Sequence, residues 1–396
     1  MEFLNDIKLC TGCGACANIC PHDAVIMQED EKGFLKPFVD TTRCTECGLC
    51  KKVCPLLKFQ SDNFESPQAF AFINQNNEVR MRSSSGGVFP AFAKYIIEKG
   101  GAVFGAVYDS SLKVCHDAAY DLKDIEKMQG SKYVQSDTKY TFRAVKNALT
   151  TGKPVLYTGT PCQIAGLKSY LGKEWENLLT IDLICHGVSS RRVFEMYKKE
   201  ILKKYKDNGR LTGLNMRDKN FGWGYGVFVT ITTTNASYHL HKTEDDFQQL
   251  FLHNLSINDS CLQCKFNKIP RTADITMGDF WGVEDYDSSL NDKKGISAVL
   301  LNSAKGQKYF KELISTDQIY SEEVPAEVII RNNRNITSSS IPHPRREEFF
   351  KDVVASKKRL SQLCEKYLKL RSNILKRIFR KLPPKLQRTI KRVLLK

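Results

Sequence analysis

The sequence predicts a small α+β module at the N-terminus, followed by a larger mixed α/β domain. Two cysteine runs, at residues 10–21 and 44–55, flank a short hairpin pattern. Beyond residue 67, strand-like apolar segments alternate with helix-like segments, which is typical of an α/β domain. We predict a module at 1–57, a linker at 58–67, the α/β domain at 68–320, a C-terminal extension at 321–364 and a basic tail at 365–396.

Each cysteine run has the spacing C-x2-C-x2-C-x3-C-P, and both runs end in a Cys-Pro pair. This is the spacing of bacterial two-cluster ferredoxins, in which the fourth cysteine of each run binds the other cluster. The sequence therefore predicts two [4Fe-4S] clusters in a ferredoxin-like module. One cluster would be held by Cys10, Cys13, Cys16 and Cys54, and the other by Cys44, Cys47, Cys50 and Cys20. Cysteine pairs also bind structural zinc, but the doubled, proline-closed spacing disfavours zinc.

Composition favours an intracellular redox protein over a secreted or membrane-spanning one. The N-terminus lacks the basic and apolar regions of a signal peptide, and no stretch is long and apolar enough to span a bilayer. Fourteen cysteines without such a signal favour metal binding in a reducing compartment over disulfides. We therefore predict a cytoplasmic location.

The first part of the α/β domain predicts a βαβ unit with a polar loop. Residues 68–74 and 102–108 have strand patterns, and a helix runs through Glu98 and ends at Gly100-Gly101. Between the first strand and the helix lies a Ser/Gly loop, residues 82–89. Its backbone amides and hydroxyls at a helix N-terminus would form an anion site. A simple helix cap in a flexible loop explains these residues equally well.

Two further cysteines are predicted at strand ends, where ligands bind in open α/β sheets. Cys162 follows the predicted strand 155–158 and begins a helix that extends to residue 171, after a preceding helix at 138–151. This position at a helix N-terminus is expected to lower the thiol pKa. Cys185 follows the predicted strand 178–184 and precedes a charged helix at 191–206.

The rest of the domain supplies a CxxC pair. We predict strands at 225–234 and 296–301 and helices at 245–255 and 305–313. Together with Cys162 and Cys185, the pair Cys261 and Cys264 makes a third four-thiolate [4Fe-4S] site reasonable. Two alternatives stay open: Cys162 as a nucleophile with His186 as its base, and a zinc or redox-active CxxC pair. Cys115 and Cys364 are interpreted as structural or incidental.

Six motifs in order resemble the beta subunit of coenzyme F-420 (deazaflavin) hydrogenases and dehydrogenases. They are residues 70–87, GSKYVQS, GTPCQIAGL, DLICHGV, CLQCKF and ADITMGDFWG, and the resemblance spans about residues 10–313. It implies a domain of the deazaflavin hydrogenase beta-subunit type that holds FAD beside an iron-sulfur cluster. The implied flavin contacts are Ser84, Ser85, Gly86, Gly87, Lys132 and Tyr133, and the implied third-cluster ligands are Cys162, Cys185, Cys261 and Cys264. We assign no catalytic residue and no specific role to Asp274 or Asp279.

The resemblance implies an iron-sulfur flavoprotein oxidoreductase that relays electrons between [4Fe-4S] clusters and FAD to a small acceptor. Family members of this layout occur near genes for surface-polysaccharide assembly, which suggests a role in that biosynthesis. An electron-donor or electron-acceptor protein is the expected partner at the ferredoxin face. The alternatives are a non-catalytic electron-relay subunit and a Cys162-dependent transferase with a ferredoxin module.

The tail carries twelve Lys or Arg residues and one acidic residue, and its apolar residues follow helical spacing. A basic amphipathic helix can lie on an anionic membrane surface. A helix that packs on its own body explains the pattern equally well. Nucleic-acid binding is not expected, because no nucleic-acid-binding module accompanies the charge.

Overall fold

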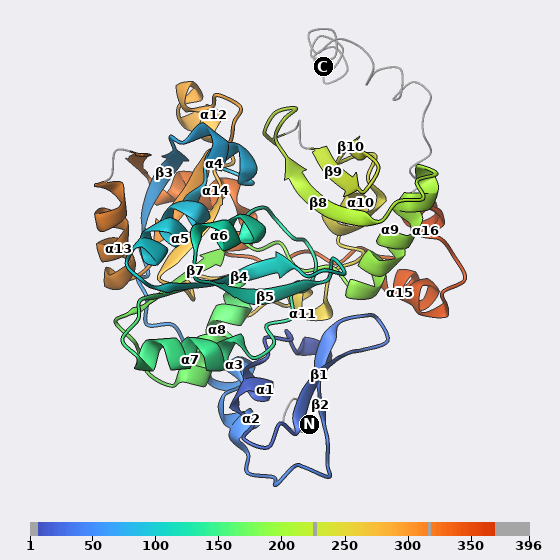
Figure 1. The fold of residues 1–396 in the computed structure, drawn as a ribbon, viewed down its shortest axis with the longest axis horizontal. Coiled ribbons are helices and arrows are strands. Elements are labelled where there is room, and N and C mark those ends of the chain that lie inside the picture. The colour runs from blue at the N-terminus through green and yellow to red at the C-terminus, as the bar shows by residue number, and fades with distance from the viewer. Residues whose placement is uncertain (1–6, 225–227, 316–317, 369–396) are drawn as a thin grey trace.

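The computed structural model describes residues 7–224, 228–315 and 318–368, and in it a small N-terminal module projects from a larger α/β body (Figure 1). The module contains the antiparallel hairpin β1 (Val25–Glu29) and β2 (Leu35–Val39), with Val25 opposite Val39. Its short helices are η1 (Ile7–Leu9), α1 (Ala15–Ile19), α2 (Leu49–Lys52) and α3 (Pro55–Lys58). α1 and α2 each follow a left-handed glycine, Gly14 and Gly48, so each cysteine loop turns tightly into its helix. The predicted two-strand module is confirmed.

An eight-stranded mixed sheet forms the centre of the body among the described residues, in the order β13-β3-β12-β11-β7-β6-β4-β5. Strands β4, β6, β7 and β11 are parallel neighbours, and β12, β13 and β5 add antiparallel pairs. The strands are β3 (Gln68–Asn74), β4 (Ala102–Tyr108), β5 (Val114–Ala119), β6 (Val155–Gly159), β7 (Leu178–Leu183), β11 (Ile275–Asp279), β12 (Ser297–Leu301) and β13 (Ile319–Val324). The parallel centre directs the carboxyl ends of β6, β7 and β11 to the same edge.

Helices cover both faces of this sheet, as expected for strands that are buried on both sides. α5, α6 and α13 pack on one face through residues such as Phe92 and Phe310, and α7 and α8 pack on the other through Phe142 and Leu167. The helices of the body are α4 (Asn77–Arg82), α5 (Val88–Glu98), α6 (Leu122–Met128), α7 (Thr141–Thr150), α8 (Pro161–Leu171), α9 (Arg191–Lys204), α10 (Asp246–Leu252), α11 (Asp259–Leu262), α12 (Val283–Tyr286), α13 (Ala304–Ile314), α14 (Ala326–Asn332), α15 (Arg346–Ala355) and α16 (Leu360–Leu368).

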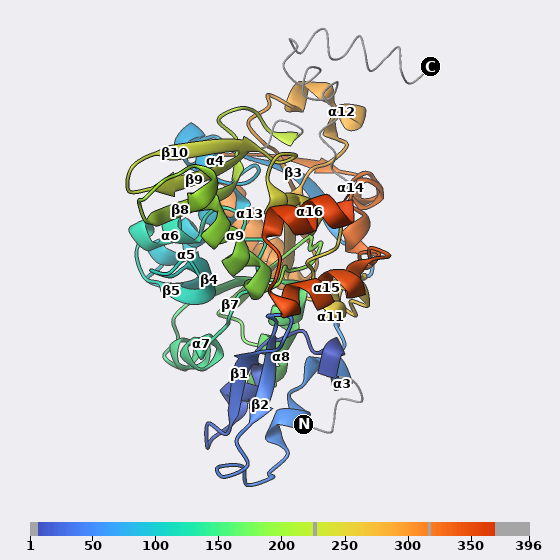
Figure 2. The same cartoon turned by 90° about the vertical axis from the view of Figure 1, so that its right-hand side faces the viewer.

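A second, three-stranded antiparallel sheet lies beside the main one, with the order β10-β9-β8. It comprises β8 (Leu211–Asp218), β9 (Phe228–Thr233) and β10 (Ser237–His241). Its apolar side packs on α9, α10, α15 and α16 in one core, which includes Phe194, Phe247 and Phe349. Figure 2 shows the C-terminal helices α15 and α16 beside α9, so the C-terminal extension is an integral part of this core.

Several sequence-based boundaries differ from the structure. β3 and β4 are parallel, but four strands lie between them in the sheet, so the predicted βαβ unit is not a pair of neighbouring strands. The boundary at 320/321 falls inside β13, and the boundary at 364/365 falls inside α16. The predicted linker is bonded to the body: the Phe64 amide donates to Asn302 O at 2.7 Å, and Ser61 Oγ donates to Arg271 O at 2.6 Å.

The predicted basic tail lies outside the described residues, apart from residues 365–368 at the end of α16. There Tyr367 is buried in the core formed with α9 and α15. Within the described part of the chain, no helix combines the length and hydropathy needed to cross a bilayer.

Candidate functional site

Four cysteines of the N-terminal module line one apolar cavity, and they are the four that the sequence grouped together. Cys10, Cys13 and Cys16 come from the first loop, and Cys54 comes from the end of the second run. Met27, Pro37 and Pro55 complete the lining. Burial, followed by the charges of Cys10, Cys54 and Cys50, raises the pKa of the Cys16 thiol. We call Cys10, Cys13, Cys16 and Cys54 the inner set.

The other four cysteines of the module gather on its outer side. Cys20 packs with Cys44 and Cys50 in a small apolar cluster, and Cys47 is exposed. Burial raises the pKa of the Cys50 thiol, and the charges of Cys44 and Cys47 add to this effect. Backbone hydrogen bonds lower the pKa by less, so the net shift is upward. We call Cys20, Cys44, Cys47 and Cys50 the outer set. Cys20 of the first run thus packs with cysteines of the second run, and the division of the eight cysteines between two clusters stays a prediction.

Among the described residues, no group of three His, Cys, Asp or Glu side chains is arranged to hold a single metal ion.

A cavity of about 320 Å³ opens at the carboxyl ends of β6, β7 and β11. It is lined by Cys162, Cys185, Cys261 and Cys264, which we call the third set. Cys162 lies in the first turn of α8, Cys185 follows β7, and the CxxC pair lies in and after α11. The structure therefore brings together four cysteines that are spread over about a hundred residues of sequence.

The expected low thiol pKa of Cys162 is wrong. Burial, followed by the charges of Cys264 and Cys261, raises the Cys162 pKa to about 12 despite its position at a helix N-terminus. Thr160 Oγ1 lies 3.2 Å from the Cys162 sulfur. His186 Nε2 is instead 2.6 Å from Asn254 Oδ1. Burial, together with the neighbouring thiols, outweighs the helix dipole here.

The Ser/Gly loop contributes to the opposite part of the same cavity. Ser84, Ser85 and Gly87 line it, and Gly87 caps α5 with a φ of 89°. Ser84 Oγ lies 2.8 Å from Ser131 Oγ. Gly86 serves packing: its amide donates to Ser297 Oγ at 2.8 Å, and an added Cβ would lie 2.1 Å from Phe72 O. The loop therefore presents the N-terminus of an eleven-residue helix to the cavity.

Lys132 and Tyr133 both line the cavity, but only Tyr133 has its side chain available there. The Lys132 ammonium donates to the carbonyl oxygens of Met128, Gln129 and Gly130 at 3.0–3.1 Å, which end α6. Burial lowers the Lys132 pKa to about 7. The Tyr133 ring stacks on Phe251 with 4.7 Å between ring centroids.

Comparison with known proteins agrees with this geometry. Residues 152–327 match the family model for the C terminus of the coenzyme F420 hydrogenase/dehydrogenase beta subunit, and residues 9–56 match that for a 4Fe-4S dicluster domain. Residues 152–327 therefore carry the C-terminal domain of this beta-subunit family, joined in one chain to a 4Fe-4S dicluster domain. The chain is an iron-sulfur electron-transfer protein related to that beta subunit.

One solved structure similar to this protein is a chain of the F420-reducing [NiFe] hydrogenase complex from Methanosarcina barkeri, from a xenon derivatization study. It shares 14% sequence identity with a TM-score of 0.44, over 78% of this chain and 95% of that chain. No curated protein matches the chain.

Two cavity residues to which the sequence assigned no role form an ion pair. Arg217 at the end of β8 binds Asp279 at the end of β11 through two nitrogens, at 2.9 and 3.2 Å. Trp223 Nε1 donates to Asp279 Oδ1 at 3.1 Å, and Arg217 Nη1 donates to the Tyr133 hydroxyl at 3.4 Å. Asp279 lies in a recognisable motif, whereas Arg217 comes from a strand with no motif, so no sequence signal marked the pair.

His116 was also missed, because it lies in an ordinary strand, β5. Its Nε2 lies 3.0 Å from Thr158 O, and its Nδ1 lies 2.7 Å from Ser136 Oγ. A carbonyl can only accept, so Nε2 carries the proton and Nδ1 accepts from Ser136. Burial lowers the His116 pKa to about 4, so the ring that lines the cavity is neutral.

The inner set lies directly against the large cavity. Thr11 lines both cavities, and the charge of Cys162 contributes to the raised pKa of Cys13, after burial and the charges of neighbouring cysteines. Gln135 fixes this contact, because it donates to Thr11 O at 3.0 Å and accepts from the Leu35 amide at 2.6 Å. The two cysteine sets are therefore held together by the body itself.

Proposed function

We propose that the chain is a flavin- and iron-sulfur-dependent oxidoreductase. In this proposal, the outer and inner sets each bind a [4Fe-4S] cluster, the third set binds another, and the large cavity binds FAD. Electrons pass along this series to or from a small acceptor. The observation that carries the proposal is one cavity with four cysteines in one part, a helix N-terminus in another and the inner set against its wall.

The cavity residues fit FAD. Ser84, Ser85 and the α5 N-terminus at Gly87 offer hydroxyl and amide donors for the phosphates. Tyr133 and Phe251 offer aromatic surface for a ring system. When bound, FAD would exchange two electrons with an acceptor and single electrons with iron-sulfur clusters.

The third set fits a cluster better than it fits a nucleophile. Burial and the neighbouring sulfurs hold its thiols in the protonated form, which is a poor nucleophile. A bound metal centre would remove these protons and use all four sulfurs. The same observation disfavours the transferase alternative.

The chain's own residues hold the proposed centres in place. Thr138 Oγ1 donates to Cys13 O at 3.1 Å, and Arg143 donates to Asn18 O at 2.7 Å and to Cys20 O at 2.8 Å. Together with Gln135, these contacts fix the inner set against the body, so electron transfer needs no movement of the module. The Arg217–Asp279 pair orients Tyr133 at the cavity wall.

The acceptor is the least specified part of the proposal. A role in surface-polysaccharide biosynthesis rests on the family resemblance, as does attachment of residues 365–396 to an anionic membrane surface. A non-catalytic relay subunit is the second candidate. Cys47 of the outer set favours it, because this cysteine is exposed and open to a partner protein.

Purification without oxygen, followed by measurement of iron, sulfide and released flavin, tests the proposal. About twelve irons and one FAD per chain are expected. About eight irons without flavin would contradict the third cluster and the flavin, and would favour the relay subunit. Turnover of a candidate acceptor by the purified chain with dithionite would then separate an enzyme from a relay.

A further inference from the structure

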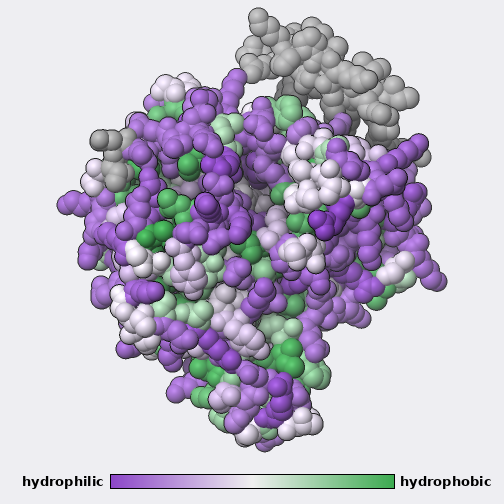
Figure 3. Space-filling model, viewed as in Figure 1, coloured by the Kyte–Doolittle hydropathy of each residue, from purple (hydrophilic) through white to green (hydrophobic). Residues whose placement is uncertain are grey.

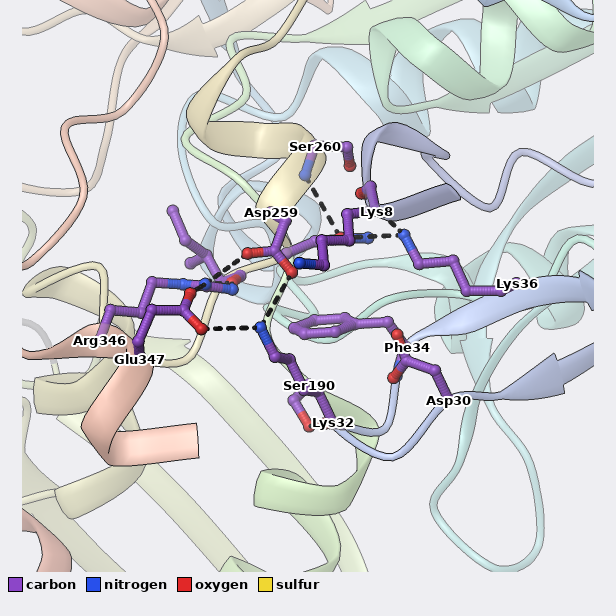
Figure 4. Close-up of polar contacts among 12 residues, drawn as sticks. Lys8, Asp30, Lys32, Phe34, Lys36, Ser190, Asp259, Ser260, Arg346 and Glu347 are labelled. Atoms are coloured by element: carbon purple, nitrogen blue, oxygen red, sulfur yellow. Dashed lines mark hydrogen bonds and ion pairs between the residues drawn. The ribbon is translucent and has the colours of Figure 1, made fainter. Parts of the chain in front are cut away.

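Lys36 is a buried lysine of the hairpin that lies between the inner set and the third set. It is 8% exposed. Its ammonium donates to Lys8 O at 3.1 Å (Figure 4). It also donates to Cys10 O at 2.6 Å and to Asn258 Oδ1 at 3.4 Å. Cys10 belongs to the inner set, and Asn258 caps α11, the helix that carries Cys261. One side chain thus links the surroundings of both sets.

The hydrogen bonds of Lys36 indicate that its amine is charged. Each of its three partners offers an oxygen that accepts, and a neutral amine has only two hydrogens to donate. Three acceptors around one nitrogen therefore fit an ammonium group.

No carboxylate compensates this charge directly. Among residues 7–224, 228–315 and 318–368, none lies within ion-pair distance of Lys36 Nζ. Asp259, which faces it, is engaged by Arg346 at 2.5 Å and by Lys32 at 3.4 Å. Asp30 accepts from the Phe34 amide at 2.9 Å. Figure 4 shows Lys32 and Arg346 converging on Asp259, with Lys36 apart from them.

A buried cation without a carboxylate partner is costly unless other negative charge is near. Cys10 of the inner set and Cys261 of the third set are the remaining negative groups that Lys36 faces once their sulfurs are thiolates. A four-thiolate iron-sulfur centre gains one further negative charge on one-electron reduction, and a nearby cation stabilises that charge.

We propose that Lys36 is a tuning residue that raises the reduction potentials of the inner and third centres relative to the outer centre. The inference rests on the proposed function. With clusters bound, one electron would leave the outer centre, which would be oxidised, and reach the inner centre, which would be reduced, without transfer of a proton or change of a covalent bond. Lys36 thereby favours passage of electrons from the exposed module into the body.

Potentiometric EPR on the full-length, anaerobically purified protein tests this role. Lys36→Gln removes the charge and keeps a hydrogen-bond donor. It should shift the electron equilibrium between the outer and inner centres about tenfold toward the outer centre, which is about 59 mV for one electron. Lys36→Arg keeps the charge and should shift the electron equilibrium less than threefold. The matched control is Lys32→Gln on the same hairpin, whose charge is already paired with Asp259.

A second variant tests the charge without removing the lysine. Asn258→Asp places a carboxylate against Lys36 Nζ and should shift the equilibrium in the same direction as Lys36→Gln. Unchanged potentials in both variants with full iron content would overturn the proposal. A shift in Lys36→Arg as large as that in Lys36→Gln would also overturn it, because it would show a geometric effect. Loss of iron in both Lys36→Gln and Asn258→Asp would overturn it as well, because it would show a role in assembly.

The wild-type iron content separates this proposal from the proposed function. About eight irons per chain would remove the third centre and with it the proposed function. The potential of the inner centre would still be measurable in Lys36→Gln, and would decide the role of Lys36 there.

Discussion

At the residue scale, burial decides the chemistry of the cavity. A helix N-terminus normally favours a thiolate, yet burial, followed by the charges of Cys264 and Cys261, raises the pKa of Cys162 to about 12. Without a bound metal, the cysteines of the third set are therefore neutral thiols of low reactivity, because a thiolate among them is unfavourable. Such a group of side chains is suited to binding a polynuclear cation, which supplies the missing positive charge.

Replacing Cys162 with Ser tests the third set directly. The change removes one of four sulfurs, so iron content should fall from about twelve to about eight per chain, while the EPR signals of the module stay. Cys115→Ser, in the core strand β5, is the control and should keep all iron. Loss of activity with undiminished iron would instead favour Cys162 as a nucleophile.

His116, which lines the cavity, makes the free energy of unfolding of the protein depend on pH. Its pKa in the folded protein, about 4, lies below the ordinary value of 6.5. As pH falls, the unfolded chain therefore takes up a proton first, and stability present above pH 6.5 is lost toward pH 4. Between pH 7 and pH 5 this loss amounts to about 2 kcal/mol.

His116→Gln should remove that part of the pH dependence, because the amide can bond Ser136 and Thr158 but does not titrate. Denaturant unfolding of the anaerobic protein at pH 5, 6 and 7 measures how the free energy of unfolding depends on pH. His22→Gln changes an exposed imidazole of the module and is the matched control. A pH dependence that is the same in His116→Gln and wild type would contradict a buried neutral ring.

At the element scale, α8 is the helix on which the module and the body meet. Its first turn carries Cys162, and one turn further Gly166 packs against the inner set. A Cβ on Gly166 would lie 2.9 Å from the Cys13 sulfur. The helix therefore fixes two cysteine sets at once, and its position sets the distance between them.

Gly166→Val should separate α8 from Cys13. Overpacking of this kind costs about 1–3 kcal/mol, and it should broaden or shift the EPR signal of the inner centre while the outer centre is unaffected. Unfolding free energy and EPR are the measurements. Gly213→Val in β8 is the control, because a Cβ added to Gly213 would lie 3.6 Å from its nearest neighbour, Thr232. Unfolding free energies that fall equally in both variants would argue against the close contact.

The same scale shows what sequence patterns can predict. Hydrophobic periodicity and glycine positions predicted β3, β4, β6, β7 and β12 of the main sheet and the helices α5, α7, α8 and α13, because these are local signals. They did not predict β5, β11 and β13. The contacts of Gln135, Arg143 and Gly166 with the module could not be predicted, because each looks like an ordinary helix or loop residue. The neighbours of β3 in the sheet likewise depend on pairing between distant segments, which no local pattern encodes.

At the scale of the whole molecule, the two halves of the module differ in exposure. The module projects from the body (Figure 1). Thr11, beside the inner set, also lines the large cavity of the body, whereas Cys47 of the outer set is exposed. The face in Figure 3 is mostly hydrophilic, with hydrophobic residues gathered where the module meets the body. The doubled cysteine motif predicted two centres, but their order relative to the cavity follows only from the docking of the module. Electrons exchanged with a partner protein would pass through the outer set.

The surface beside the outer set predicts the charge of that partner. Lys51 and Lys52 are both exposed on α2, next to Cys50. Opposite charges across an interface mainly accelerate association, and salt weakens the effect. An acidic one-electron carrier protein is therefore the expected donor, and the double variant Lys51→Glu/Lys52→Glu should lower its kcat/KM about tenfold at low salt.

Three comparisons decide this last prediction. The rate of reduction by dithionite, a small donor, should be nearly the same in the variant and the wild type. With the protein donor, a higher salt concentration should make the kcat/KM of the variant and of the wild type more similar. Lys308→Glu/Lys311→Glu makes the same charge change on the exposed side of α13, outside the module. If that control slows the protein donor as much as the α2 variant does, net charge rather than a local docking surface governs the reaction. A slower reaction with dithionite as well would place the effect in the outer centre itself.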